Sequence, residues 1–293
     1  MNQPLGRPGT ADVPFSDADF QALAELAHRE FGLSLAQSKK PLVYSRLSRR
    51  LKARNIASFP AYLKLLNEAN ETDERLELIS ALTTNVTSFF RENHHFEMLR
   101  ADCLPAAIER ARGGKRLRIW SAGCSSGQEP YCIAMTLLDM MPEARRHNVK
   151  ILATDIDPQI VAKAKAGRYP AEEASSIPDR FRQKWVKLSV EDNARIVISE
   201  ELKGLVTFAE LNLIAEWPFR GPFDAIFCRN VAIYFDQATQ QRLWHRFADM
   251  LAPGGLLFIG HSERVTGPAM QMLSGVGITS YQKIAPHRAA HMQ

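Results

Sequence analysis

From residue 116 onward, short apolar runs alternate with segments of helical periodicity, and this alternation constrains the fold more than any other feature. It is typical of βαβ units, in which helices connect the strands of a largely parallel sheet. We expect strands at 116–121, 150–154, 206–210, 225–228 and 256–260. We expect helices at 129–141, 157–166 and 237–251, with Gly254 and Gly255 ending the last of these. The sequence therefore predicts an α/β fold with a mostly parallel sheet.

The alternation breaks between about 170 and 205. Residues 195–199 read as a strand outside the main series, and the segment 181–193 before it has a mixed pattern. We therefore predict a small β subdomain inserted into the α/β domain.

The first part of the chain has helical patterns only. Ser16 followed by Asp19 resembles a capping box, and Gly32 provides a stop for the helix that follows. A second helix is expected from about Ser38 with Pro41 in its first turn, and two more at 58–69 and 72–82. We predict an all-α domain over 15–84 after a disordered tail, 1–14. A link at 85–95 then leads into the α/β domain, 96–285, and a second tail, 286–293.

Positive charge is concentrated in one segment. Residues 31–67 contain eight basic residues and no acidic one, whereas the chain as a whole has a net charge of +5. The rest of the protein is therefore slightly acidic. Such a segment is expected of a surface that binds a polyanion or an acidic protein, although a solvated basic face is the plainer alternative.

Composition excludes several classes of protein. A chain of 293 residues with 45% hydrophobic and 24% charged residues is neither wholly disordered nor a coiled coil. Four scattered cysteines suggest no disulfide framework and no metal site, so a reducing cytoplasm fits best. Neither a signal peptide nor an apolar run of transmembrane length is visible, so we expect neither export nor membrane insertion.

A small-residue loop between a strand and a helix is the strongest local motif, running Ser121-Ala-Gly-Cys-Ser-Ser-Gly127 before Glu129. Glycines there let a ligand approach the backbone, although a tight turn without a ligand has the same pattern. Asp155 ends the next strand, where a carboxylate can hold a ribose diol. The loop lacks the G-x-G-x-x-G pattern of dinucleotide sites, so a ribose ligand without pyrophosphate fits better. Asp157 is placed to cap the following helix.

Several longer motifs occur together in one order. They are Asn85-Val-Thr87-Ser-Phe-Phe-Arg91-Glu, Ser125-Ser-Gly-Gln-Glu129-Pro-Tyr, Ala153-Thr-Asp155-Ile-Asp, Cys228-Arg229-Asn230-Val-Ala-Ile-Tyr234 and Gly260-His-Ser-Glu263. Over residues 15–285 the chain closely resembles the bacterial chemotaxis receptor methyltransferases of the CheR type. The resemblance implies a class I, Rossmann-like methyltransferase domain with a small antiparallel β insertion, preceded by an all-α domain.

The resemblance also implies an activity and site residues. The activity is methyl transfer from S-adenosylmethionine to receptor glutamates, giving glutamate methyl esters and S-adenosylhomocysteine without a metal. Arg91 and Tyr234 would serve catalysis, and Arg91 would also bind the cofactor. The other cofactor-binding residues implied are Asn85, Thr87, Glu129, Asp155, Asn212, Leu213, Arg229 and Asn230. Because a glutamate is ionised at neutral pH, no general base is needed, and His261 is expected to be structural.

The implied partner is the cytoplasmic signalling domain of chemoreceptors, with the enzyme in the cytoplasm and recruited to receptor arrays. The basic segment would dock on it through Arg46, Arg49, Arg50 and Arg54. Family members that tether to a receptor's C-terminal pentapeptide carry a glycine-rich loop in the insertion, whereas residues 187–195 contain no glycine. Tethering is therefore not expected.

Two other functions remain open. One is a methyltransferase of the same fold acting on a nucleic acid or small molecule. The segment 228–234 lacks the Asp-Pro-Pro-Tyr type of motif that acts on exocyclic amines, so no nucleic-acid substrate is expected. The other is a cofactor-binding module that docks on receptors without catalysis, which the presence of Arg91, Arg229 and Tyr234 disfavours.

Overall fold

The computed structural model describes residues 13–68, 70–83 and 85–285, and the predicted tails lie largely outside them. The chain divides into two compact units between residues 84 and 85. Each is described by itself. Among the described helices, none has both the length and the apolar composition needed to cross a bilayer.

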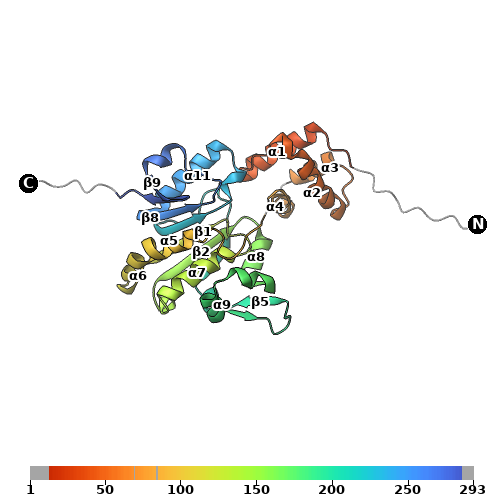
Figure 1. Ribbon diagram of the computed structural model, residues 1–293. Coiled ribbons are helices and arrows are strands. Elements are labelled where there is room, and N and C mark those ends of the chain that lie inside the picture. The colour runs from red at the N-terminus through yellow and green to blue at the C-terminus, as the bar shows by residue number, and fades with distance from the viewer. Residues whose placement is uncertain (1–12, 69, 84, 286–293) are drawn as a thin grey trace, which may run out of the picture. The chain divides into compact units, whose positions relative to one another are not determined.

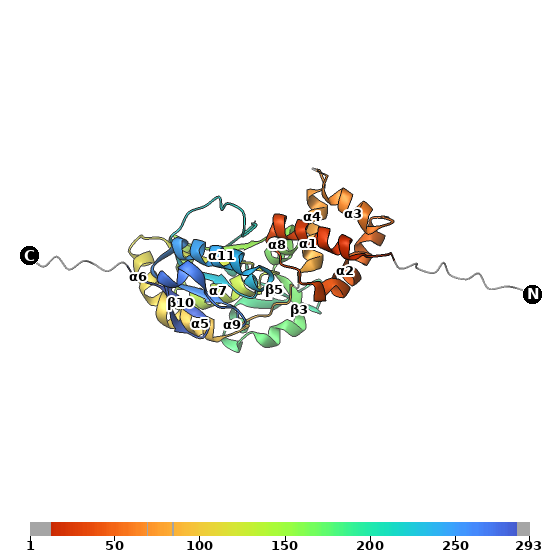
Figure 2. The ribbon, with the colours of Figure 1, turned by 90° about the horizontal axis from the view of Figure 1, so that it is seen from above.

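The first unit consists of helices α1 (Asp17–Phe31), α2 (Lys40–Ala53), α3 (Phe59–Leu66) and α4 (Thr72–Leu82), with a 3-10 turn, η1 (Gln37–Lys39), before α2 (Figure 2). The capping box at Ser16 and Asp19 is confirmed, and Gly32 ends α1 in the left-handed conformation with φ 72°. Buried side chains at helical spacing, such as Val43, Leu47 and Leu51 on α2, form the core of this unit.

Acidic side chains from α4 offset part of the basic segment. Arg50 donates to both carboxylate oxygens of Glu74 at 2.7 Å, and its Nη1 lies 3.1 Å from Glu77. Arg54 pairs with Glu71 at 3.0 Å. Arg50 and Arg54 therefore have balancing acids, although residues 31–67 contain none, because these acids lie on α4 and at Glu71 directly before it.

A seven-stranded sheet forms the centre of the second unit, in the order β6-β2-β1-β7-β8-β10-β9. The strands β1 (Leu117–Ala122), β2 (Val149–Asp155), β6 (Val206–Glu210), β7 (Phe223–Cys228) and β8 (Leu251–Ile259) are parallel. These are the five strands expected from the sequence. Two antiparallel strands that the sequence analysis did not identify, β9 (Leu273–Gly277) and β10 (Ser280–Lys283), complete one edge.

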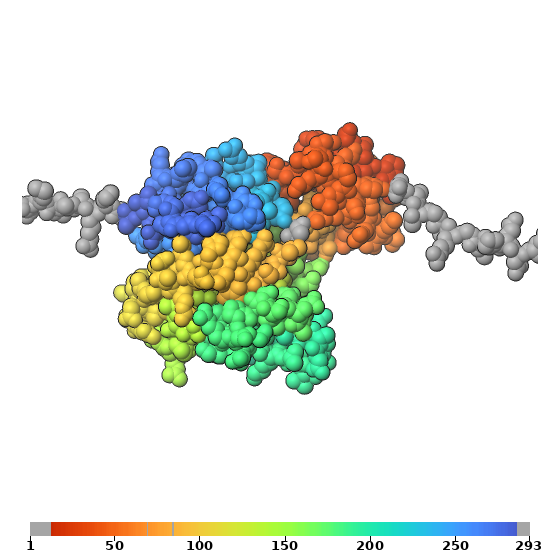
Figure 3. Space-filling model, viewed as in Figure 1, coloured from red at the N-terminus to blue at the C-terminus, as the bar shows by residue number. Residues whose placement is uncertain are grey.

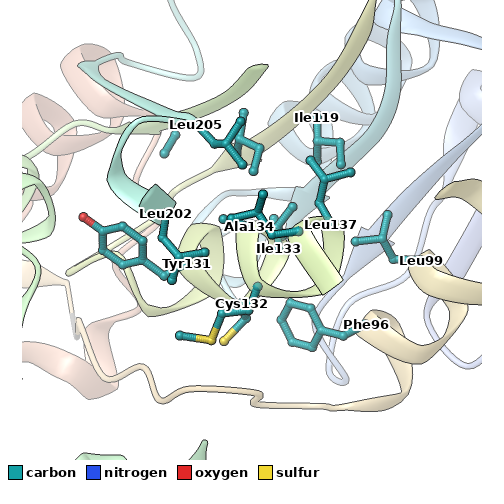
Figure 4. Packing of buried hydrophobic residues seen from close by; sticks show 14 of the residues in the cluster. Phe96, Leu99, Ile119, Tyr131, Cys132, Ile133, Ala134, Leu137, Leu202 and Leu205 are labelled. Carbon is teal, nitrogen blue, oxygen red and sulfur yellow. The ribbon is translucent and has the colours of Figure 1, made fainter. Parts of the chain in front are cut away.

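Helices cover both faces of this sheet (Figure 1). Ile119 of β1 packs in one buried cluster with Ile133 and Leu137 of α7 (Gln128–Met140) (Figure 4). The next residue, Trp120, points to the opposite face, where its ring lies 5.2 Å from Phe247 of α11 (Gln237–Met250). This alternation is the two-residue period of a strand that is buried on both faces. The remaining elements of the two layers are α5 (His94–Met98), the π-helix η2 (Leu99–Cys103), α6 (Leu104–Arg112), η3 (Ala144–Arg146), α8 (Pro158–Ala166), η5 (Ala232–Tyr234) and η6 (Gly267–Gln271).

The end of α11 differs from the prediction. The helix ends at Met250, and Gly254 and Gly255 lie within β8 rather than at the helix end. Leu251 is already extended, with φ −78° and ψ 145°, and it is buried and paired with Phe223 of β7. Strand pairing thus begins directly after the helix and stops it before the glycines.

The inserted β subdomain is confirmed between α8 and β6. Its antiparallel sheet has the order β3-β5-β4, formed by β3 (Arg168–Pro170), β4 (Val186–Leu188) and β5 (Arg195–Ile198). The mixed segment is α9 (Asp179–Trp185) followed by β4, while η4 (Ala171–Ser176) and α10 (Glu200–Lys203) complete the insert. In the space-filling view the insert (green) forms a lobe of the second unit (Figure 3).

Candidate functional site

The candidate site lies at the carboxyl ends of the parallel strands. From β1 the chain continues on one side to β2 and β6, whereas β7 and β8 lie on the other side of β1. This change of direction creates a crevice beside β1, which is where open α/β sheets bind ligands. The side chains singled out from the sequence follow the ends of these strands.

The loop after β1 is held by the end of β2. The backbone N–H groups of Gly123 and Cys124 both donate to the carbonyl of Thr154 at 2.8 Å. Gly123 has φ +82°, and a Cβ added to it would lie 2.4 Å from Cγ2 of Val231. Glycine is therefore required there both by the backbone conformation and by the close approach of the segment after β7.

Asp155 faces this loop, while Asp157 belongs to the helix that follows. Asp155 accepts a hydrogen bond from the backbone N–H of Ser125 at 2.8 Å, and burial raises the pKa of its carboxyl group. Asp157 accepts from the backbone N–H groups of Gln159 and Ile160, so its predicted role as the α8 cap is confirmed. The Ser125 hydroxyl also donates to the carbonyl of Asn85 at 3.2 Å, which places Asn85 beside the loop.

Glu129 and Arg229 form the polar centre of the site. Arg229 Nη1 donates to Glu129 Oε2 at 3.1 Å, and Ser121 Oγ donates to Glu129 Oε1 at 2.7 Å. Arg229 Nη2 also donates to the backbone carbonyl of Arg91. Burial raises the pKa of Glu129, although Arg229 and Ser121 oppose the shift. Arg91 itself is partly buried, and its Nη1 donates to the carbonyl of Val86 at 3.0 Å.

A second acid, Glu92, lies on the other side of the Arg229 guanidinium. Its Oε2 is 3.4 Å from Arg229 Nη2, and its Oε1 is 3.3 Å from Nδ1 of His261. Burial acts to raise the pKa of Glu92, but Arg229 and His261 outweigh it and leave the pKa lowered. His95, which is fully buried beside Glu92, has its pKa lowered to about 3, chiefly by burial.

The ends of β7 and β8 are tied together by Glu263. This buried carboxylate accepts from the backbone N–H groups of Gly260, Asn230 and Ile233 at 2.6, 3.1 and 3.1 Å. Those bonds fix Asn230 and the short turn η5, which contains Tyr234. Glu263 therefore sets the position of two of the predicted site residues.

The predicted residues after β6 are also held in place. Leu213 is buried, and its carbonyl accepts from Trp217 Nε1 at 3.2 Å and from Arg246 Nη1 at 2.8 Å. Asn212 accepts from the backbone N–H of Ile214 at 3.1 Å. Thr87, the remaining predicted residue, is partly buried in the segment before Arg91.

Several residues other than glycine have a left-handed backbone around the site, namely Phe90, Glu92, Ser125 and Asn230, with φ between 49° and 59°. Each such conformation costs about 1–3 kcal/mol and persists only where the surroundings impose it. They gather on the loops after β1 and β7 and in the segment before α5, which are therefore the candidate functional segments. Sequence analysis assigned no role to Ser121, Ser125, Glu92 or Glu263, although all four lie within or beside the quoted motifs.

Comparison with known proteins assigns both units to one family. The family model for the CheR methyltransferase SAM-binding domain matches residues 85–281, and the model for the CheR all-alpha domain matches residues 18–83. The chain belongs to the CheR methyltransferase family. The predicted resemblance and the predicted fold class are thereby confirmed.

Relatives within the CheR family match nearly the whole chain. A probable chemotaxis protein methyltransferase of Rhizobium etli is 47% identical over 258 residues, covering 88% of this chain and 96% of the relative. A chemotaxis protein methyltransferase of Escherichia coli is 43% identical and covers 87% of each chain. Chemotaxis protein methyltransferase 2 of Pseudomonas aeruginosa is 43% identical over 93% of this chain and 95% of its own. The chain is thus a methyltransferase with an S-adenosylmethionine-binding domain, of a family that works in chemotaxis.

Proposed function

We propose that the protein transfers a methyl group from S-adenosylmethionine to side-chain carboxylates of glutamates in the cytoplasmic signalling domain of chemoreceptors. The products are glutamate methyl esters and S-adenosylhomocysteine. The observation that carries the proposal is the Ser121–Glu129–Arg229 contact series at the carboxyl ends of β1 and β7, in a chain that matches chemotaxis methyltransferases over most of its length.

The chemistry of the side chains fits this cofactor. Glu129 is a buried carboxylate that can receive the ammonium group of the methionine end. Asp155 ends β2, where its oxygens can accept from both hydroxyls of a ribose. Leu213 and Asn212, held after β6, provide an apolar and a polar contact for adenine. Asn85 contacts the loop after β1, the Arg91 carbonyl contacts Arg229, and Asn230 follows β7. With Thr87 they complete the proposed binding set.

The bound cofactor supplies an electrophilic methyl group on a positively charged sulfur. As the oxygen–carbon bond forms and the carbon–sulfur bond breaks, carboxylate and sulfonium charges are both neutralised, and no proton is transferred. A glutamate with a usual pKa of about 4.3 is already ionised, so the protein need only align it and exclude water. We assign orientation of that carboxylate to Arg91 and Tyr234. Arg229 donates to the backbone carbonyl of Arg91, and the Arg91 guanidinium donates through Nη1 to the carbonyl of Val86, so both ends of the residue are held.

Carboxyl methylation is tested with methyl-labelled S-adenosylmethionine and receptor-containing bacterial membranes. The label should appear on a receptor-sized band and be released by mild base as volatile methanol. Arg91→Ala should abolish it, whereas Arg112→Ala, which removes an arginine with surface ion pairs on α6, should not. Label that survives base would mean transfer to nitrogen or sulfur and would refute the proposal. Cofactor binding without any label would favour the non-catalytic module.

We further propose that α2 is the receptor-docking surface, as its charge suggests. Arg46, Arg49 and Arg50 line a groove of about 330 Å³ between α2 and α4. Arg50 and Arg54 are held by acids of α4, so the exposed Arg49 is the strongest candidate for contact with an acidic partner, and Arg46 lies beside it. Arg49→Glu should weaken receptor binding, and the binding that remains should depend less on the salt concentration. Arg29→Glu on α1, also exposed, is the control.

A further inference from the structure

Three neighbouring residues each have a buried polar atom that lacks a hydrogen-bond partner. These atoms are Glu92 Oε2, His94 Nε2 and His95 Nδ1. One ligand atom from each of these residues lies within 4.8 Å of one from the other two. Buried polar atoms without partners are rare and costly, so three in one cluster require an explanation.

The tautomer of His95 decides whether its Nδ1 carries a proton or a lone pair. Its Nε2 lies 3.3 Å from the carbonyl oxygen of Ile278 and 3.0 Å from the Thr279 hydroxyl. The Ile278 carbonyl can only accept, and in the tautomer that donates to it from Nε2, Nδ1 presents a lone pair. That lone pair lies 3.6 Å from Oε2 of Glu92, which is also an acceptor. Two acceptors facing each other need a cation or a donor between them.

Arg229 supplies a donor near only one of these atoms, Glu92 Oε2. Its Nη2 lies 3.4 Å from Glu92 Oε2, whereas His94 Nε2 and His95 Nδ1 have no hydrogen-bond partner. One metal ion could take a ligand atom from each of the three residues. With zinc bonds of about 2.0–2.2 Å, donors around a tetrahedral ion lie about 3.4 Å apart, close to the observed 3.6 Å between Glu92 and His95.

The surroundings of the cluster match those of metal-binding histidines. Such a histidine almost always donates its second ring N–H to a carbonyl or carboxylate, as His95 does to Ile278. The two segments that hold the cluster are themselves constrained, because Glu92 and Thr279 have φ of 54° and 49°. His95 is completely buried, so its orientation is fixed before any ion arrives.

We propose that Glu92, His94 and His95 bind one divalent transition-metal ion of the zinc class. Imidazole and carboxylate ligands suit zinc, cobalt, nickel and copper, and a fourth position remains for water or for His261, whose Nδ1 is 3.3 Å from Glu92 Oε1. The ion fixes the segment that begins with Arg91 against the turn at Ile278 and Thr279. The sequence analysis expected no metal, because these residues match none of the spacings it considered.

The test is a titration of the metal-free full-length protein with Co²⁺, followed by visible absorption, with Zn²⁺ as competitor. The sequence also contains His287 and His291, so the experiment uses the His287→Ala/His291→Ala variant as its background. We expect one equivalent of Co²⁺ to bind and Zn²⁺ to displace it. His94→Ala and Glu92→Gln should each weaken binding at least tenfold, whereas His245→Ala, at an exposed position of α11, should not change it.

Zn²⁺ should also raise the midpoint of thermal unfolding of the background protein but not of His94→Ala, since a ligand stabilises the state that binds it. His94 is preferred to the buried His95 for substitution because its loss is less disruptive to folding, which circular dichroism checks. The proposal is overturned if the background protein binds no Co²⁺. It is overturned equally if His94→Ala and His245→Ala bind alike, or if the spectrum shows cysteine thiolate ligands.

Discussion

Arg229 and Glu129 are 100 residues apart in the sequence, yet Arg229 Nη1 lies 3.1 Å from Glu129 Oε2. The arginine is 8% exposed. Its other nitrogen reaches Glu92 and the carbonyl of Arg91, so one guanidinium connects α7, the end of β7 and the segment before α5. A desolvated, ion-paired carboxylate is thereby held at the centre of the proposed cofactor site.

Replacing Glu129 should weaken cofactor binding. A hydrogen bond to a charged group contributes about 1.5–3 kcal/mol, so Glu129→Gln should lower the affinity for S-adenosylhomocysteine at least tenfold by titration calorimetry. Burial raises the pKa of Glu129, so wild-type affinity should fall as the pH drops through that raised value, while the variant stays flat over the same range. Glu109→Gln, at an exposed position on α6, is the control. Equal pH profiles for wild type and variant would show that Glu129 does not contact the ligand.

Substitutions of Asp155 and Asp157 should have different effects, the first on cofactor binding and the second on stability. Asp155→Ala removes the acceptor at the end of β2 and should weaken S-adenosylhomocysteine binding tenfold or more. Asp157→Ala removes the α8 cap and should lower the free energy of unfolding by about 1 kcal/mol, with little change in the affinity of the folded protein. Calorimetry and urea unfolding of both variants check this. The assignment fails if the two variants lose affinity equally.

Gly123→Ala tests the close approach between the loops after β1 and β7. Its added Cβ would overlap Val231, and its φ of +82° is unfavourable for alanine, so we expect loss of cofactor binding and of stability. Val231→Ala in the same chain removes the overlapping methyl group but not the backbone strain. The double variant should therefore recover part of the loss. A Gly123→Ala protein that binds S-adenosylhomocysteine normally would show that the loop has room to move.

The sequence predicted the five parallel strands because each contains a short apolar run, although only β1 and β7 are buried almost throughout and the edge strand β6 is largely accessible. It did not predict α5 and α6, whose helical pattern is interrupted by the π-helix η2. The motifs also singled out Asp155, Glu129 and Arg229, which the structure places at or after the carboxyl ends of β2, β1 and β7. Nothing in the sequence indicated the pairing of Arg50 with Glu74, because that pairing depends on a tertiary contact between two helices that periodicity treats separately. Glu92 and His95 are only three residues apart, but their approach depends on the left-handed backbone at Glu92, which the sequence does not reveal.

The Arg50–Glu74 pair should stabilise the first unit. The side chain of Glu74 is completely buried and also accepts from the Tyr62 hydroxyl at 2.8 Å. Removing one partner of a buried pair costs about 3 kcal/mol, so Glu74→Gln should destabilise this unit by roughly that amount. Glu30→Gln, which breaks an exposed pair with Arg29, should change stability by less than about 0.5 kcal/mol. All four tryptophans lie in the second unit, so circular dichroism reports both units in urea, whereas tryptophan fluorescence reports only the second.

This stabilisation should depend on pH in one direction. Burial alone would raise the pKa of Glu74, but the hydrogen bonds from Arg50 and Tyr62 outweigh it and leave the pKa below 4.5 in the folded state. The folded protein therefore holds the Glu74 proton less tightly than the unfolded chain does. The stability difference between wild type and Glu74→Gln should be constant above about pH 6 and shrink as the pH falls below about 4.5, through the folded pKa. A difference that persists unchanged at low pH would mean that the loss comes from packing around the amide rather than from the charge.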